Sequence, residues 1–128
     1  MSTADNKAFI TRYLEALSGK PKPASVYNQY IADSDPELKE HIVMAEAAFP
    51  EYELVADEML AEGNKVVVRG RTRGTHKGEF AGLPPTNKTF EVPIVVIYEI
   101  ENGKIVNHWL LADNMGVMQQ LGAIPAQA

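Results

Sequence analysis

The hydrophobic residues near the start of the chain recur at the spacing of an amphipathic helix. Apolar side chains three and four positions apart fall on one face of a helix, and here they are Phe9, Ile10, Tyr13, Leu14 and Leu17. Gly19 and the prolines at 21 and 23 then stop this helix. A short second helix is predicted over residues 24–32.

A third helix is predicted between two prolines. Asp35 directly precedes Pro36, which is the arrangement of an N-cap residue followed by proline at the first helical position. Pro50 ends this helix. Its apolar stripe consists of Leu38, Ile42, Ala45 and Phe49.

After Pro50 the pattern changes to that of β-strands, because Val, Ile, Thr and Tyr become frequent between turn residues. Asn102-Gly103 is a strong two-residue hairpin signal, since both residues tolerate positive φ. A loop over 78–88 contains Pro84-Pro85. A last short helix, 114–121, stops at Gly122. The predicted strands are 51–61, 64–77, 88–101 and 104–113.

Helices followed by hairpin-linked strands predict an α+β fold in which helices cover one face of a curved antiparallel sheet. At 128 residues the chain is expected to be a single domain, 1–128. The strand at 90–100 is apolar on both faces, as strands buried on both sides are. The sheet face without helices must then be buried against other protein. We expect a homodimer through that sheet face, and a chain terminus folded over it is the alternative.

Composition excludes several classes of function. The net charge of −5 argues against a nucleic-acid partner. The absence of cysteine excludes thiolate chemistry, and three histidines at uninformative separations predict no metal site. No apolar run is long enough for a membrane span, and the first 20 residues do not resemble a signal peptide. We therefore expect a cytoplasmic protein with no membrane association.

Asp113 is the candidate catalytic residue. Strand alternation places it on one face with Trp109 and Leu111, where desolvation would raise its carboxyl pKa and suit it to acid/base chemistry. The alternative is that Asp113 is only the N-cap of the helix that begins at Asn114.

Other side chains are candidates for lining a pocket. His41 lies beside the apolar stripe of its helix, and the glycines around His76 favour a strand end that aims this side chain inward. Surface positions are the alternatives for both. The tyrosines are core or rim residues, of which a buried one can donate to a ligand carbonyl. The expected pocket-lining residues are His41, Phe49, His76, Tyr98 and Trp109.

Arg69, Arg71 and Arg73 alternate along one predicted strand, opposite Glu53 and Asp57 on another. We interpret them as an exposed cross-strand charge ladder rather than an anion site. Nucleotide-binding and nucleophile-elbow motifs are absent from the sequence.

From Ala56 onward, the chain strongly resembles the SnoaL-like polyketide cyclases, which belong to the NTF2-like superfamily of α+β cones. The residues that carry the resemblance are Gly74-Thr75-His76, Gly78-Glu79-Phe80, Pro84-Pro85-Thr86, Gly103-Lys104-Ile105, His108-Trp109, Asp113 and Gln119-Gln120-Leu121-Gly122.

The resemblance implies a cystatin/NTF2-like cone with an enclosed pocket and chemistry that uses no cofactor and no metal. It implies that Asp113 is the acid/base in an intramolecular aldol closure, and that the ligand is a small apolar carbonyl compound, polyketide- or ketoester-like. The alternatives are a non-catalytic small-molecule-binding or accessory protein, with Asp113 as a helix N-cap, and a protein-interaction module similar to nuclear transport factor 2.

Overall fold

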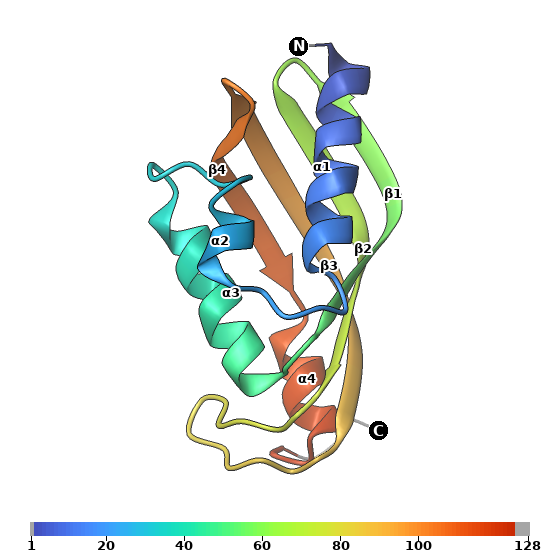
Figure 1. The fold of residues 1–128 in the computed structure, drawn as a ribbon. Helices are drawn as coiled ribbons and strands as arrows, with labels where there is room; N and C mark the ends of the chain where they lie inside the picture. Colours follow the sequence, from blue (N-terminus) through green and yellow to red (C-terminus); the bar gives the residue numbers. More distant parts are fainter. Residues whose placement is uncertain (1, 125–128) are drawn as a thin grey trace.

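The computed structural model describes residues 2–124, which form helices on one side of a four-stranded sheet (Figure 1). The helices are α1 (Thr3–Leu17), α2 (Ala24–Tyr27), α3 (Pro36–Ala48) and α4 (Asn114–Gln120). The strands are β1 (Glu53–Glu62), β2 (Lys65–Thr75), β3 (Thr89–Glu101) and β4 (Lys104–Ala112).

Helix boundaries follow the capping signals. Ser2 and Asp5 form a capping box at the start of α1, and Asp35 caps α3 by accepting a hydrogen bond from the backbone N–H of Leu38. The prediction for α2 was too long. Ile31 instead forms an isolated parallel bridge with Ile105 of β4, which requires extended backbone and so ends the helix early.

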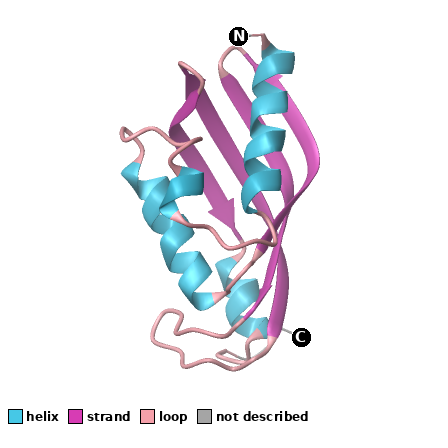
Figure 2. Cartoon of the chain, viewed as in Figure 1, coloured by secondary structure: helices cyan, strands magenta, loops and turns pink. Residues whose placement is uncertain are grey.

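The sheet is antiparallel throughout, in the order β1-β2-β3-β4 (Figure 2). Asn102 and Gly103 have φ values of 51° and 74°, so the predicted hairpin turn is confirmed. A bulge at Asp57 interrupts the β1–β2 register between Ala56 and Glu58.

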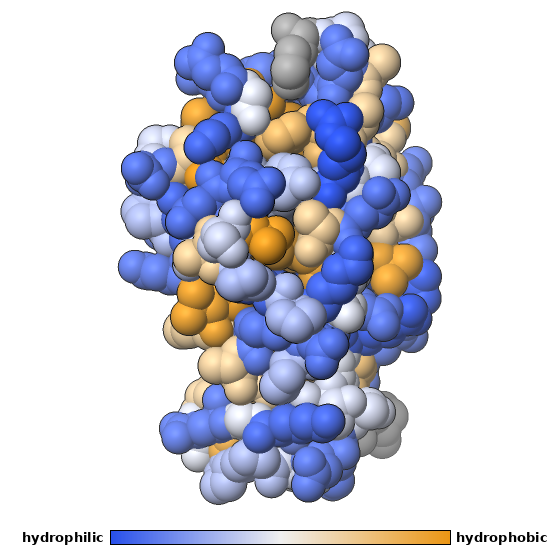
Figure 3. Space-filling view, in the orientation of Figure 1, coloured by the Kyte–Doolittle hydropathy of each residue, from blue (hydrophilic) through white to orange (hydrophobic). Residues whose placement is uncertain are grey.

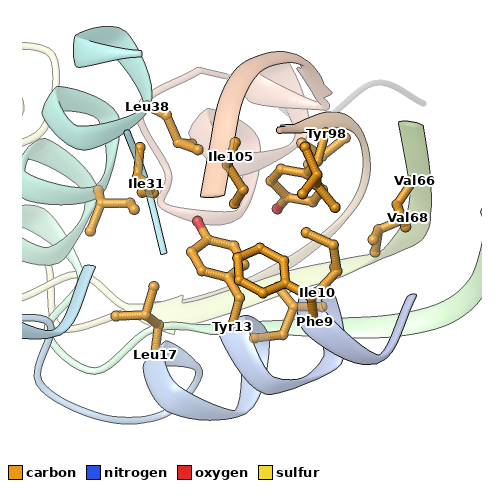
Figure 4. Packing of buried hydrophobic residues seen from close by; sticks show 14 of the residues in the cluster. Phe9, Ile10, Tyr13, Leu17, Ile31, Leu38, Val66, Val68, Tyr98 and Ile105 are labelled. Carbon is orange, nitrogen blue, oxygen red and sulfur yellow. The ribbon is translucent and has the colours of Figure 1, made fainter. Parts of the chain in front are cut away.

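The main core lies between α1, α3 and the concave face of the sheet. Phe9, Ile10 and Tyr13 of α1 pack toward Tyr98 of β3, as Figure 4 shows. One full face of β3 is buried, and these residues are Phe90, Val92, Ile94, Val96 and Tyr98. The α+β cone predicted from the sequence is confirmed.

The opposite face of the sheet carries no helix in the described part of the chain, 2–124. Trp109 and Leu111 are 54% and 61% exposed there. Arg71 and Arg73 share Glu91 and also pair with Asp57 and Glu53, so the expected charge ladder is present. The homodimer through this face stays a prediction.

The side covered by helices is mostly polar, with small apolar patches (Figure 3). Exposed Val43 and Met44 lie on the outer side of α3. No helix within residues 2–124 is long and apolar enough to cross a bilayer.

Candidate active site

An apolar cavity of about 100 Å³ lies between α1, α3, α4 and the sheet. Its size is somewhat below the roughly 150 Å³ of a cavity that holds one benzene ring, so it fits a small ligand. Most of its wall is aliphatic and aromatic. The polar side chains that line it are Tyr13, His41, Tyr52, Thr72, Tyr98 and Asn114.

Tyr13 and Tyr98 form a buried pair across the cavity. Their rings are 5.6 Å apart in an edge-to-face arrangement, and their hydroxyl groups point toward the space between α1 and β3 (Figure 4). Burial raises the pKa of both phenols far above the usual value; the interaction with Tyr98 raises the pKa of Tyr13 further, whereas the hydrogen bond with Tyr13 lowers the pKa of Tyr98 and so opposes part of its shift. The pair therefore stays protonated near neutral pH and can supply hydrogen-bond donors to a ligand.

His41 borders the cavity from α3 and is also exposed to solvent on its outer side. Desolvation on the inner side lowers the pKa of His41, and positive charge on the nearby His108 lowers it further. The neutral imidazole is thereby favoured, which is the form that accepts a proton.

A buried carboxylate and a histidine meet next to this wall. Oδ2 of Asp35 accepts a hydrogen bond from Nδ1 of His108 at 2.7 Å, and Asp35 is 4% exposed. The bridge between Ile31 and Ile105 brings these residues together, because it aligns the segment before α3 with β4. The hydroxyl of Ser34 extends the alignment by donating to the carbonyl of Val106.

Lys22 stiffens the far end of the cavity wall. Its ammonium group donates to Glu46 and to the carbonyl of Tyr52, and it lies 4.1 Å from the centroid of the Tyr52 ring. Burial lowers the pKa of Lys22, and Glu46 opposes that shift. With its hydrogen bonds already satisfied, Lys22 serves to hold Tyr52 in place.

His76 is fully buried, as the sequence predicted for a side chain aimed inward. It does not line the cavity itself. The ring centroids of His76 and Phe49 are 5.6 Å apart. Phe49 lines the cavity, so His76 supports the cavity wall from behind. Close approach of Gly78 to the end of α3 permits this packing, because a Cβ there would collide with the carbonyl of Ala47.

The family model for SnoaL-like polyketide cyclases matches residues 26–121. The chain belongs to the SnoaL-like polyketide cyclase family.

Solved structures agree in fold with this SnoaL-like chain. A proposed hydroxylase from Streptomyces galilaeus superposes with a TM-score of 0.85 at 23% identity, covering 99% of this chain and 87% of that one. A proposed SnoaL-like polyketide cyclase from Jannaschia sp. CCS1 gives 0.83 at 21% identity, with 96% and 95% covered. A proposed polyketide cyclase from Streptomyces antibioticus gives 0.77 at 24%, with 91% and 98% covered.

Comparison with curated proteins gives no match. At these identities the solved structures establish the fold of this SnoaL-like protein, and the proposed activities belong to those proteins.

The structure places the expected site residues of this SnoaL-like chain in two groups. His41, Phe49 and Tyr98 line the cavity, while Trp109 and Asp113 do not. Their shared face on β4 points outward, and Leu110 and Ala112 of the other face line the cavity instead. The expected position of Trp109 and Asp113 in the pocket is therefore corrected, because the face of β4 turned toward the cavity carries Leu110 and Ala112.

Asp113 is exposed and caps α4, since its Oδ1 accepts the backbone N–H of Gly116 at 2.8 Å. Its neighbour Asn114 lines the cavity. The geometry matches the N-cap alternative, and the catalytic role that the family resemblance implies stays a prediction.

Sequence reasoning assigned Asp35 only a capping role and gave His108 no partner. No local pattern in the sequence pairs the acid before α3 with the histidine on β4. The residues are 73 positions apart, and their register is set by the bridge between Ile31 and Ile105 and by the Ser34–Val106 hydrogen bond. Within residues 2–124, no cluster of three or more metal-ligating side chains occurs.

Proposed function

We propose that this protein is a cyclase- or isomerase-type enzyme that acts by general acid/base chemistry on a small apolar carbonyl compound. The observation that carries the proposal is the cavity itself, where a histidine favoured in its neutral form and a protonated tyrosine pair border an otherwise apolar space. Family membership supports the same class of reaction.

The chemistry follows from these groups. A carbon flanked by carbonyl groups loses its proton to the neutral imidazole of His41. The hydroxyl groups of Tyr13 and Tyr98 donate to the resulting enolate oxygen, in a space from which water is excluded. The enolate carbon then attacks a second carbonyl to close a ring, or takes a proton at another carbon to give an isomer. The imidazolium returns the proton in either case, so no cofactor is consumed.

The small size of the cavity disfavours a fused polyketide. A buried tyrosine donor that is fixed by packing costs no reorganisation when charge develops on the substrate. This supports a substrate whose carbonyl lies against the two hydroxyl groups while its apolar part contacts the aliphatic wall.

A non-catalytic small-molecule-binding protein is the second candidate function. The cap that Asp113 makes on α4 favours it, because that carboxylate is then occupied by a structural hydrogen bond. A binder predicts that the ligand raises the midpoint of thermal unfolding without any product being formed.

Proton exchange of ethyl acetoacetate in deuterated buffer, followed by proton NMR, tests the proposal. We expect the wild type to accelerate exchange at the carbon between the carbonyls and His41→Gln to lose roughly 10²-fold of that acceleration. The matched control is Glu40→Gln, an exposed neighbour on α3. An undiminished rate in folded His41→Gln excludes His41 as the base. Binding without exchange in the wild type supports the non-catalytic function.

Asp113→Asn belongs in the same assay. Asparagine keeps the cap, so this variant changes only the charge and basicity of the side chain. We expect full activity, and a large loss would return the acid/base role to Asp113.

We also propose that the working unit is a homodimer formed through the outer face of the sheet. Trp109, Leu111 and Leu60 are each more than half exposed on β4 and β1, and large apolar side chains grouped on one face are typical of an interface.

A further inference from the structure

The pair formed by Asp35 and His108 is built to hold one histidine tautomer. Both oxygens of the carboxylate are used, since Oδ1 accepts the backbone N–H of Leu38 at 3.2 Å and Oδ2 accepts from His108 at 2.7 Å. The side chain of Asp35 is 4% exposed and that of His108 is 13% exposed. The carboxylate is therefore fixed by the helix cap and cannot swing away from the imidazole.

An ionised carboxylate can only accept hydrogen bonds, so Nδ1 of His108 carries the proton. In the neutral ring the lone pair then resides on Nε2. Within residues 2–124 the ring of His108 hydrogen-bonds to Asp35 through Nδ1, and the ring lines a solvent-open hollow. His108 thus offers a base with a defined direction, oriented in the way that a buried acid orients a catalytic histidine.

His108 faces the second histidine through a solvent-open hollow. The hollow is lined by Glu37, His41, His108, Trp109 and Leu110. Two of these residues, His41 and Leu110, also line the cavity. His41 and Leu110 therefore form the wall shared by the cavity and the hollow, and His108 lines only the hollow.

A small set of titratable side chains surrounds His108. Asp35 and Glu37 at the start of α3 are its acidic neighbours, and His41 on α3 is the basic one. Tyr98, its cross-strand partner on β3, contributes a neutral phenol. Charge on His108 lowers the pKa of His41, so a proton on His108 disfavours a proton added to His41.

We propose that Asp35 and His108 form a proton-exchange pair that carries the proton taken up by His41 between the cavity and solvent. The proposal rests on the proposed function. The proton that leaves the substrate carbon on His41 passes across the hollow to Nε2 of His108, which gives it to water or returns it. Nδ1 keeps its own proton throughout, and Asp35 stays ionised. His108 is thus a relay and Asp35 a positioning residue.

Asp35→Asn is the decisive variant. Asparagine caps a helix about as well as aspartate does, so α3 is retained. Its amide would donate to Nδ1 and move the ring proton to Nε2, which removes the accepting lone pair from the hollow. The matched control is Asp33→Asn, because Asp33 is a fully exposed acid two residues away that pairs with Lys39.

Nitrogen-15 NMR of the histidine rings tests the tautomer without any substrate. We expect His108 to carry its proton on Nδ1 in the wild type and in Asp33→Asn, and on Nε2 in Asp35→Asn. We also expect His108→Gln to raise the pKa of His41, since a neighbouring positive charge is removed. Finding the wild-type proton on Nε2, or an unchanged His41 titration, overturns the relay.

The ethyl acetoacetate exchange assay tests the relay by its effect on the exchange rate. We expect Asp35→Asn and His108→Gln to lose at least about tenfold in exchange rate, and to shift the pH profile of the remaining rate toward that of His41 alone. Full activity in Asp35→Asn overturns the relay and leaves the proposed function standing. No exchange by the wild type overturns the proposed function and the relay with it.

Discussion

The backbone N–H of Thr86 donates a hydrogen bond to Nδ1 of His76 at 3.2 Å, and the Thr86 hydroxyl lies 3.0 Å from the same nitrogen. Because Nδ1 accepts, the ring proton is on Nε2, which is buried and has no hydrogen-bond partner in the described chain. The long loop between β2 and β3 is therefore anchored to the protein interior by one imidazole.

We expect His76→Ala to lower the free energy of unfolding by about 2–3 kcal/mol, because it leaves a void behind Phe49 and an unpaired N–H on Thr86. Denaturant titration measures the change. Lys77→Ala is the control, since that side chain is exposed, and it should stay within about 0.5 kcal/mol of the wild type. A similar loss in both variants would contradict the anchoring role.

The protein should unfold readily in alkali. Burial raises the pKa of Tyr13, Tyr52 and Tyr98 above the ordinary value of 10.0. An unfolded chain then releases these protons before the folded one does, so stability is intact below pH 10 and falls as pH rises above it. The slope reaches about 1.4 kcal/mol per pH unit for each tyrosine that titrates on unfolding.

Denaturant titrations at a series of pH values, with tyrosinate absorbance recorded in parallel, measure this slope. Tyr98→Phe should reduce the slope of stability against pH by the contribution of one tyrosine. Tyrosinate that appears before unfolding would show that the pair is accessible to hydroxide and would contradict its burial.

The role of Asp113 in stability can be separated from any role in chemistry. Asp113→Ala should cost about 1 kcal/mol through loss of the α4 cap, while Asp113→Asn should cost little, because both aspartate and asparagine accept the Gly116 N–H. Thermal unfolding of the two variants, side by side, gives the comparison. Equal destabilisation by both would point to the charge rather than the cap.

The outer sheet face can be tested by one substitution. Trp109→Glu should convert a dimer into monomers, since a charge at the centre of an apolar interface is left unpaired. Sedimentation velocity measures the mass. The control is Met44→Glu, which changes an even more exposed apolar side chain on the helix side of the molecule. A wild-type monomer at all concentrations removes the dimer proposal.

Local signals predicted most of the fold. The spacing in α1, the Asp35-Pro36 pair and the Asn102-Gly103 turn each specify structure through neighbours only a few residues away, and all three are found. The early end of α2 was missed because Ile31 is drawn to Ile105, a contact that no local pattern reports.

The site was predicted less well, for a physical reason. Alternation along β4 shows which residues share a face but not which face turns inward, and that choice depends on how the sheet curls around α1 and α3. Trp109 and Asp113 were thus placed in the pocket, whereas Leu110 and Ala112 occupy it. His41, Phe49 and Tyr98 line the cavity, and their contact with a substrate stays a prediction.

The bridge between Ile31 and Ile105 also determines when the Asp35–His108 pair can form during synthesis. Chains emerge from the ribosome N-terminal end first. Asp35 therefore has no histidine partner until β4 has been synthesised. Helices α1 to α3 and the first hairpin precede β4 in the chain, but Asp35 meets His108 only when nearly the whole chain is available. A nascent or C-terminally truncated chain would therefore contain much of the fold and lack this pair.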